Sequence, residues 1–411
     1  MSIRKKIKAV VFLGMNPWYH KEINDTVRFL TRAAVQVDRF YLNPPPGLKN
    51  SLQHLTQFKR AFSWQIEEDE GVRVFTPPLG FVPVALGLRE QAEAWTARQF
   101  AQWLQQRYGP EWREQVLVYI SSWSYTQANF IRQLAPRYLL FHLLDDTLAF
   151  PMIKNEPRVW RENQKFLADL MNRSNLVLAV SEELARKYGA LYAREILVVK
   201  NGVDVEMFRG APAINLPSEL AAFRASRGNR DTEKNDPPPV LMYVGSINSW
   251  VDLNLLVELA RQKPDYNLVL IGHCFEDTIV LEPWERLLAQ PNVYWLKSKP
   301  YALIPSYMQA ASVLLLPRTE AEHSRASDPL KLYEYLSTGK PVVSTALPAV
   351  EDFRELVYVA RNPAEFAGQI EAALTQHGTP QAQRQQAVVE KHSWSSRIKE
   401  IEHLWEKHVH D

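Results

Sequence analysis

The chain has 411 residues, of which 46% are hydrophobic and 23% charged, and its formal net charge at pH 7 is +2. These values are those of a soluble globular protein with two or three domains, and they give no indication of a nucleic-acid partner. The single cysteine, Cys274, excludes an intrachain disulfide and any metal site built from several cysteines.

The sequence shows no membrane-spanning segment, since no apolar run reaches the roughly 20 residues that a membrane helix needs. The start, residues 2–14, resembles a signal peptide, but its apolar part is short and Asn16-Pro-Trp-Tyr19 is a poor cleavage site. We therefore expect a cytoplasmic protein. Arg4, Lys5 and Lys6 could give peripheral contact with a membrane surface, although a solvated terminus explains them as well.

In the first half of the chain, short apolar runs alternate with helical patterns, which predicts a parallel sheet wrapped by helices over residues 1–209. The helical patterns are clearest at residues 89–108 and 157–172, and residues 44–70 are expected to form a long loop. The expected strands lie at residues 9–13, 37–42, 72–75, 116–120, 139–144, 176–180 and 196–199.

Two polar groups follow strands of this first domain. Met15-Asn-Pro-Trp-Tyr-His20 comes after the first strand, and Asp145-Asp146 comes after the strand at 139–144. Catalytic residues of α/β proteins gather at such strand ends. Asp145 or Asp146 could orient a hydroxyl group and act as a general base, and His20 is another candidate base. The two acids would equally suit the cap of a following helix or loop.

A polar, charged stretch that ends in three prolines predicts a linker over residues 210–239. A second alternating pattern follows over residues 240–392, with no nucleotide-binding glycine motif of the dinucleotide or P-loop type. Residues 393–411 form an amphipathic tail. The second pattern has expected strands at 240–244, 267–271, 293–296, 313–316, 341–345 and 356–359, and expected helices at 252–262, 280–290, 303–310, 329–337 and 363–375.

Residues 328–345 predict a short helix that runs directly into a buried strand. Pro329 suits the first helical position, Asp328 or Ser327 can cap the helix, and Gly339 can end it. Lys331 lies in the first turn, where its charge opposes the helix dipole by about 0.3–1 kcal/mol unless an anion binds there. A lysine beside free amide groups suits a phosphate.

Glu334 lies three residues after Lys331, so it projects near the same side of the helix. A carboxylate at this place can accept two hydrogen bonds from a sugar diol while the lysine neutralises phosphates. An ordinary surface ion pair between the two residues explains the spacing equally well, so the pattern alone does not decide between them.

The stretch Asp328-Pro-Leu-Lys-Leu-Tyr-Glu-Tyr-Leu, followed by Gly339-Lys-Pro-Val-Val, resembles the donor-site helix of GT-B nucleotide-sugar glycosyltransferases. It is most similar to glycosyltransferase family 4 and to bacterial cell-surface polysaccharide enzymes of the teichuronic-acid type. Asn201-Gly-Val-Asp, with Phe208, resembles the segment that leads to the hinge in this family. The resemblance implies that Glu334 holds the ribose hydroxyls of the nucleotide and that Lys331 lies near the diphosphate.

The resemblance further implies an α/β fold of two Rossmann-like domains facing a cleft, with the last helix crossing back to the first domain and with no metal or cofactor.

Tyr243-Val-Gly-Ser-Ile-Asn248 matches the loop that lies against the donor phosphates. Many family members carry an arginine and a lysine just after this glycine, and this chain does not. The diphosphate is then expected to be held by Lys331, Arg318 and Arg325. The binding candidates are Gly245, Ser246, Asn248, His273, Arg318, Asp328, Lys331, Leu332 and Glu334, with Lys297 and Lys299 as weaker ones.

Ala326 stands where the family has the first of two glutamates, so the sequence leaves retention or inversion of the sugar open. We predict a hexosyltransferase that moves a sugar from a nucleotide-diphosphate sugar, UDP-linked, to a carbohydrate or lipid-linked hydroxyl in polysaccharide or glycolipid synthesis. Lys331 is expected to act in catalysis by stabilising the departing diphosphate. A sugar-nucleotide 2-epimerase of the same fold, or a non-catalytic nucleotide-sugar-binding subunit, are the alternatives.

Overall fold

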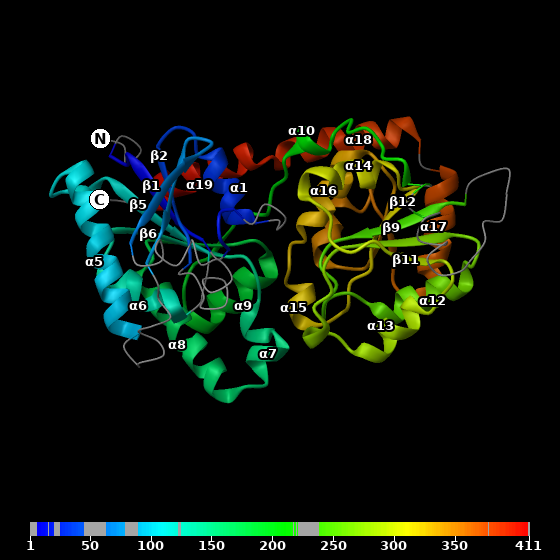
Figure 1. Cartoon of the computed structure of the whole chain (residues 1–411), viewed down its shortest axis with the longest axis horizontal. Coiled ribbons are helices and arrows are strands. Elements are labelled where there is room, and N and C mark those ends of the chain that lie inside the picture. Colours follow the sequence, from blue (N-terminus) through cyan, green and yellow to red (C-terminus); the bar gives the residue numbers. More distant parts are fainter. Residues whose placement is uncertain are drawn as a thin grey trace. The chain divides into compact units, whose positions relative to one another are not determined.

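The computed structural model describes residues 6–14, 16–19, 25–44, 63–78, 89–121, 125–216, 218, 220, 238–376 and 378–409. The chain forms two compact units (Figure 1). The first contains Met1–Lys200 together with Trp394–Asp411, and the second contains Asn201–Ser393. Each unit has its own sheet with helices around it, so both are α/β, as the sequence predicts.

The sheet of the first unit has the strand order β3-β4-β2-β1-β5-β6-β7-β8. All neighbouring strands are parallel except β3 and β4. The strands are β1 (Ala9–Leu13), β2 (Asp38–Leu42), β3 (Gln65–Asp69), β4 (Val72–Thr76), β5 (Val116–Ile120), β6 (Tyr138–Leu143), β7 (Leu176–Ala179) and β8 (Leu197–Val198). The longer helices are α1 (Thr26–Ala33), α5 (Arg89–Tyr108), α6 (Tyr125–Leu134), α8 (Pro157–Arg173), α9 (Glu182–Tyr192) and α19 (Trp394–His408).

Strand β3 corrects the expectation of a continuous loop over residues 44–70. Its sequence, Gln-Ile-Glu-Glu-Asp, carries no apolar alternation, and it lies at the edge of the sheet. It forms a hairpin with β4 through Glu70 and Gly71, both of which have positive φ. That backbone twist suits a two-residue hairpin turn. The turn and the pairing with β4 therefore hold a strand that its own composition does not predict.

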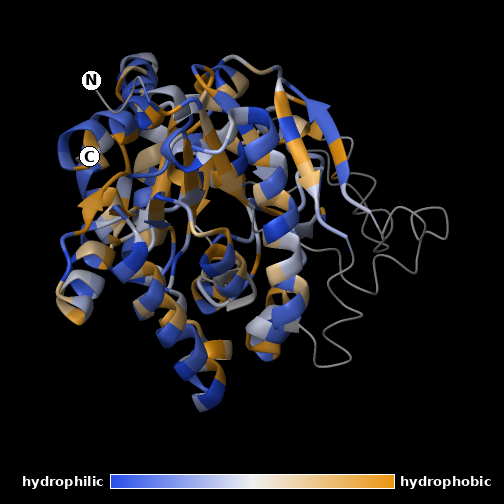
Figure 2. Cartoon of the chain, turned by 90° about the vertical axis from the view of Figure 1, so that its left-hand side faces the viewer, coloured by the Kyte–Doolittle hydropathy of each residue, from blue (hydrophilic) through white to orange (hydrophobic). Residues whose placement is uncertain are grey.

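The centre of the first sheet is apolar, as a parallel sheet with helices on both faces requires. Every residue of β5 and β6 is buried. Figure 2 shows orange, hydrophobic strands inside the first unit, surrounded by helices that carry both hydrophilic and hydrophobic residues. Helix α19 belongs to this core, because the Trp394 ring stacks on Phe29 with centroids 5.5 Å apart and the Trp405 ring meets Tyr138 edge-on.

The sheet of the second unit has the strand order β11-β10-β9-β12-β13-β14, and all its strands are parallel. Its direction of winding reverses between β9 and β12, the place where open α/β sheets bind ligands. The strands are β9 (Val240–Val244), β10 (Asn267–Ile271), β11 (Val293–Trp295), β12 (Val313–Leu316), β13 (Val342–Thr345) and β14 (Tyr358–Ala360). Its helices include α12 (Leu253–Gln262), α13 (Leu281–Leu288), α14 (Ile304–Gln309), α15 (Glu322–Arg325), α16 (Leu330–Thr338), α17 (Pro363–Gln376) and α18 (Thr379–Val389).

The units divide after Lys200, ahead of the boundary expected at residue 209. Residues 201–208 pack with the second unit, because the backbone N–H of Asn201 donates to Asp328 Oδ2 at 2.6 Å and Phe208 is fully buried in the core of that unit. The segment includes the short helix α10 (Val205–Phe208), which follows its capping residue Asp204.

In the described part of the chain, no helix is long and apolar enough to cross a membrane.

Candidate functional site

The loops that follow β9 and β12 are joined at the reversal point of the second sheet. Val251 and Arg318 form an isolated antiparallel bridge. The N–H of Thr319 also donates to the carbonyl of Trp250 at 3.0 Å. The loops after β9, β10 and β11 are bonded in the same manner, since Gly245 N–H donates to Ile271 and Gly272 N–H donates to Lys297. The carboxyl ends of these strands therefore present one continuous polar rim.

Gly245 lies directly beneath the side chain of Lys331. Its φ is +145°, and a Cβ added to it would stand 1.6 Å from Lys331 Cε. The hydroxyl of Tyr335, one turn further along α16, is bonded to the backbone N–H and carbonyl of Val244, at 2.9 and 3.1 Å. Helix α16 is thus fixed against the end of β9, and only glycine at position 245 leaves room for the lysine.

Two cations meet at this rim. The guanidinium of Arg318 is buried, donates to Ser327 Oγ at 2.7 Å and lies 5.2 Å from the Trp250 ring centroid. Burial and the neighbouring Arg318 lower the pKa of Lys331 to about 8. An anion that approaches Lys331 therefore stabilises the charged form of its side chain. Arg325 is exposed on α15 and has no comparable enclosure.

Glu334 is the acidic member of the site and is 5% exposed. The hydroxyl of Tyr301 donates to Glu334 Oε1 at 2.7 Å. Burial raises the pKa of Glu334 to about 7, while the Tyr301 hydrogen bond and the charge of Lys331 act in the opposite direction. Lys331 and Glu334 are brought together as predicted. No local pattern in the sequence marks Tyr301 as part of the site, because it lies 33 positions before Glu334.

The expectation that Asp328 or Ser327 caps α16 is wrong. Asp328 is buried and accepts hydrogen bonds from the backbone N–H of Asn201 and from the hydroxyl of Tyr333, at 2.6 and 2.8 Å. The Ser327 hydroxyl donates to the carbonyl of Ser324. Pro329 takes the cap position, and no described side chain caps the helix. The Asp328 carboxylate thus holds the chain at the start of α16 instead of facing a ligand.

The remaining binding candidates differ in accessibility. Leu332 is fully buried in the core of the second unit, so its side chain is not available to a ligand. Asn248 is also buried, and its carbonyl accepts from Val251 N–H within the loop after β9. Ser246 is partly exposed in the same loop, and its carbonyl accepts from the hydroxyl of Tyr243.

His273 is exposed and helps to line a hollow of about 630 Å³ at the ends of β10 and β11. Lys297, in the same wall, has a φ of +59° and holds its Nζ 3.1 Å from the centroid of the Trp295 ring. The indole N–H of Trp295 donates to the Gly272 carbonyl, which fixes the ring. The hollow therefore offers a flat aromatic ring and polar groups next to the Gly272 turn.

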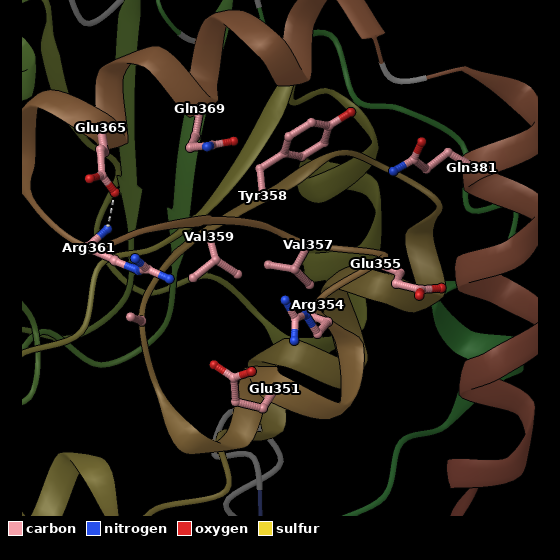
Figure 3. A pocket seen from close by; sticks show the side chains of 11 residues that line it. Glu351, Arg354, Glu355, Val357, Tyr358, Val359, Arg361, Glu365, Gln369 and Gln381 are labelled. Atoms are coloured by element: carbon pink, nitrogen blue, oxygen red, sulfur yellow. Dashed lines mark hydrogen bonds between the residues drawn. The ribbon is translucent and has the colours of Figure 1, made fainter.

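A second hollow, also of about 630 Å³, lies beside the edge strand β14 (Figure 3). It contains three carboxylates and two guanidinium groups, from Glu351, Glu355, Glu365, Arg354 and Arg361. None of the predicted binding residues lines it. Because acids outnumber bases there, it suits a diphosphate less well than the rim at Lys331 does.

In the first unit, Asp146 does not have the predicted role. Its carboxylate is fully buried and is bonded to Lys187 Nζ at 2.6 Å and to the hydroxyl of Tyr188 at 2.8 Å. Neither oxygen faces solvent, so Asp146 cannot receive a proton from an incoming hydroxyl. Asp145 is exposed at the end of β6. It remains the accessible acid of the pair.

Replacing Asp146 by asparagine should destabilise the first unit by about 1–3 kcal/mol, since a charged hydrogen-bond acceptor is lost while Lys187 and Tyr188 stay in place. Asp145→Asn should leave stability within about 0.5 kcal/mol of the wild type. Thermal and urea unfolding of both variants checks this. Equal stability losses in the two variants would contradict a structural role for Asp146.

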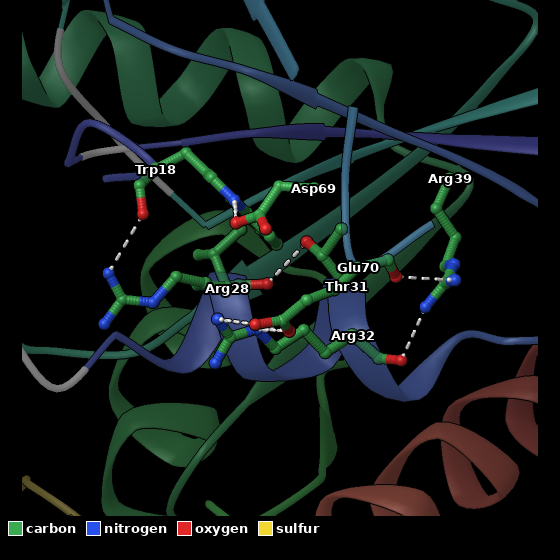
Figure 4. A network of polar contacts seen from close by, with 8 residues as sticks. Trp18, Arg28, Thr31, Arg32, Arg39, Asp69 and Glu70 are labelled. Atoms are coloured by element: carbon green, nitrogen blue, oxygen red, sulfur yellow. Dashed lines mark hydrogen bonds and ion pairs between the residues drawn. The ribbon is translucent and has the colours of Figure 1, made fainter. Parts of the chain in front are cut away.

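The loop after β1 is also held by structural contacts (Figure 4). Trp18 is fully buried, its indole N–H donates to Asp69 Oδ2 at 2.8 Å, and its carbonyl accepts from Arg28. Trp18 therefore has no face available to stack on a sugar. His20 lies outside the described residues. Arg32 and Glu70 form an ion pair beside this network.

Metal binding has no ready site in the described part of the chain, where no group of three or more histidine, cysteine, aspartate or glutamate side chains could hold an ion.

The second unit is similar in sequence to known glycosyltransferases. Residues 227–389 match the family described as Glycosyl transferases group 1. A Bacillus subtilis (strain 168) protein named as a teichuronic acid biosynthesis glycosyltransferase, TuaH, is 29% identical over 188 residues. That alignment covers 45% of this chain and 44% of TuaH. The predicted resemblance to glycosyltransferases is thereby confirmed.

Solved structures identify the fold of the whole chain. Anabaena HepE in complex with UDP-glucose has a TM-score of 0.63 at 17% identity, covering 97% of this chain and 99% of that one. The E. coli trehalose-6-phosphate structure bound with UDP-2-fluoro glucose has a TM-score of 0.65 at 12% identity, with the same coverage. The fold is therefore GT-B, as predicted.

Proposed function

Because residues 227–389 form a glycosyl transferases group 1 domain in a chain with the GT-B fold, we propose that the protein transfers a sugar from a UDP-linked sugar to a hydroxyl acceptor. The observation that carries this proposal is the position of Lys331. Its side chain lies across Gly245 at the N-terminal end of α16, where no described side chain caps the helix. A helix start with a lysine beside it is suited to a diphosphate.

The donor would be held at both of its polar parts. Lys331 and Arg318 would hold the phosphates, with the backbone of the Gly245 loop beneath them. Glu334, one turn further along α16, would hold the ribose diol. The hollow lined by His273 and Trp295 lies at the ends of β10 and β11. Its aromatic ring suits the flat base of the nucleotide.

In the transfer, the bond between sugar C1 and the phosphate oxygen breaks, and its electron pair leaves with the diphosphate. The acceptor oxygen forms the new bond to C1 and gives up its proton. Positive charge beside the leaving group stabilises the negative charge that develops on it. The proton passes to the departing phosphate in a retaining transfer, or to a general base in an inverting one.

Two findings support the choice of donor and product class. Structures of HepE, which this chain resembles in fold, contain UDP and UDP-glucose. TuaH, which shares sequence with this chain, is named for teichuronic acid biosynthesis. We accordingly propose a carbohydrate or lipid-linked acceptor in polysaccharide synthesis, with contact to a membrane surface where the acceptor is lipid-linked.

The test is a thermal-shift panel of UDP-, GDP-, TDP- and ADP-glucose on wild type and Glu334→Ala. We expect the largest shift with the UDP-sugar, about 2.7 kcal/mol of stabilisation at 100 times Kd, and its loss in Glu334→Ala. Slow release of UDP from the donor without acceptor should fall in parallel. Binding without any UDP release would indicate a non-catalytic subunit, and a C2-inverted sugar seen by NMR would indicate an epimerase.

A further inference from the structure

The segment from Asn201 to Phe208 makes two separate contacts near helix α16, one with the residue Asp328 before the helix and one with Tyr301, which is bonded to Glu334 of the helix. At its first residue, the Asn201 amide Nδ2 donates to the Asp328 carbonyl at 2.6 Å, and the Asn201 backbone N–H donates to the Asp328 carboxylate. These contacts lie just before α16 begins. At its last residue, the fully buried Phe208 ring meets the Tyr301 ring edge-on, with centroids 6.2 Å apart.

Tyr301 carries the second contact into the site. It begins the 3₁₀ turn Tyr301–Leu303, after β11, and its ring packs against the core of the second unit. Its hydroxyl donates to Glu334 Oε1 at 2.7 Å. Phe208, Tyr301 and Glu334 thus form a continuous chain of contacts from a buried aromatic ring to a buried carboxylate.

A buried carboxylate on a helix can rotate about its side-chain bonds unless a partner holds it. A phenol hydroxyl is a suitable partner, because it donates one hydrogen bond to one carboxylate oxygen. The second oxygen lies in the plane of the carboxylate, so its direction is then fixed as well. The ring of Tyr301 is itself held by Phe208. The geometry therefore fixes the position of Glu334 before any ligand arrives.

We propose that Tyr301 is a positioning residue of the donor site, which fixes the Glu334 carboxylate for the ribose diol of the nucleotide, and that residues 201–208 support it. This inference rests on the proposed function, since it assumes that Glu334 meets the donor. It assigns a role to the Asn-Gly-Val-Asp segment, which the sequence resemblance gave only as a lead-in to the hinge.

The charged and titratable groups around Glu334 give the proposal a pH signature. They are Tyr301, which bonds it, Lys331 on its own helix, Tyr335 beside it, and Arg318 beyond the lysine. Donor affinity should fall as pH drops through about 7, the raised pKa of Glu334, because a protonated carboxyl no longer accepts two hydrogen bonds. Affinity should fall again above about 8, where Lys331 loses its charge.

The experiment measures the Kd of UDP-glucose by calorimetry, from pH 5.5 to 9, for wild type, Tyr301→Phe, Glu334→Gln and the double variant. We expect Tyr301→Phe to raise the Kd about tenfold at pH 7.5, as a hydrogen bond to a charged group is lost. The acid limb should move to higher pH, because the lost hydrogen bond favoured the ionised carboxylate. The alkaline limb should stay in place.

The double variant separates positioning from general damage. If Tyr301 acts through Glu334, the double variant binds no more weakly than Glu334→Gln alone. The matched control is Tyr266→Phe, which removes a similar hydrogen bond, from the Tyr266 hydroxyl to Glu371 Oε1 at 2.9 Å, and should leave the Kd unchanged. An unmoved acid limb with an unchanged Kd, or additive losses in the double variant, would overturn the proposal. Absence of UDP-glucose binding by the wild type at every pH would instead overturn the proposed function.

Discussion

Replacing Lys331 by methionine should lower the rate of sugar transfer by about 10²–10³-fold, the usual effect of removing one group that stabilises a developing negative charge. Methionine keeps an apolar stem of similar length over Gly245, so the packing of α16 on the loop after β9 is retained. What disappears is the positive charge, which the departing diphosphate needs more than the bound donor does. The loss should therefore be larger in kcat than in the Kd for UDP-glucose.

The matched control for this variant is Lys340→Met. Lys340 lies just beyond the other end of the same helix, after Gly339, and burial also lowers its pKa. It has no place at the rim formed by the loops after β9 and β12. UDP release by the two variants is measured with the same donor and acceptor. If both variants lose activity equally, or if Lys331→Met transfers sugar at the wild-type rate, the charge of Lys331 has no part in the reaction.

The alternation of strands and helices could be predicted because it depends on local apolar runs. Strands such as Val116–Ile120 and Val313–Leu316 are buried along their whole length, and they show this in their composition. Strand β3 could not be predicted from its polar sequence, since its structure depends on pairing with β4. Helix α18 is rich in glutamine and weakly amphipathic, and it packs against α16 through contacts that its sequence does not indicate.

The site was predictable where its signals were local. Lys331 and Glu334 are three residues apart on one helix, and Gly245 directly follows a strand. Contacts between distant residues could not be read in this way, because Tyr301 meets Glu334 across 33 positions and Asn201 meets Asp328 across 127. Both partners of such a contact look ordinary in the sequence, and the fold alone brings them together.

The pair Asp145-Asp146 shows the same limit over a shorter range. The two acids are neighbours at a strand end, where either could face solvent. The structure directs Asp146 inward, to Lys187 and Tyr188 on α9, which lie 41 and 42 positions further along the chain. The sequence thus predicts that a strand end carries functional residues. Which of two adjacent carboxylates faces solvent depends on which one finds a buried partner.

Gly245→Ala should lower the rate of sugar transfer about as much as Lys331→Met does, without unfolding the protein. The added Cβ would lie 1.6 Å from Lys331 Cε and 2.4 Å from its Nζ. The end of a lysine side chain is flexible, so it can move aside, but it then leaves the place proposed for the phosphates. The positive φ of residue 245 adds a backbone strain of about 1–3 kcal/mol, and thermal unfolding should register that cost.

A double variant tests whether the clash with Lys331 is the cause. In a Lys331→Ala background the three atoms nearest to the new methyl group are gone, so Gly245→Ala should cost less stability there than in the wild type, and the rate of transfer should fall no further. Gly210→Ala serves as the control, because its φ is +65° and no atom lies within 4 Å of an added Cβ. That variant should show the strain without the loss of transfer. If Gly245→Ala transfers sugar at the wild-type rate, Lys331 does not need to lie across this glycine.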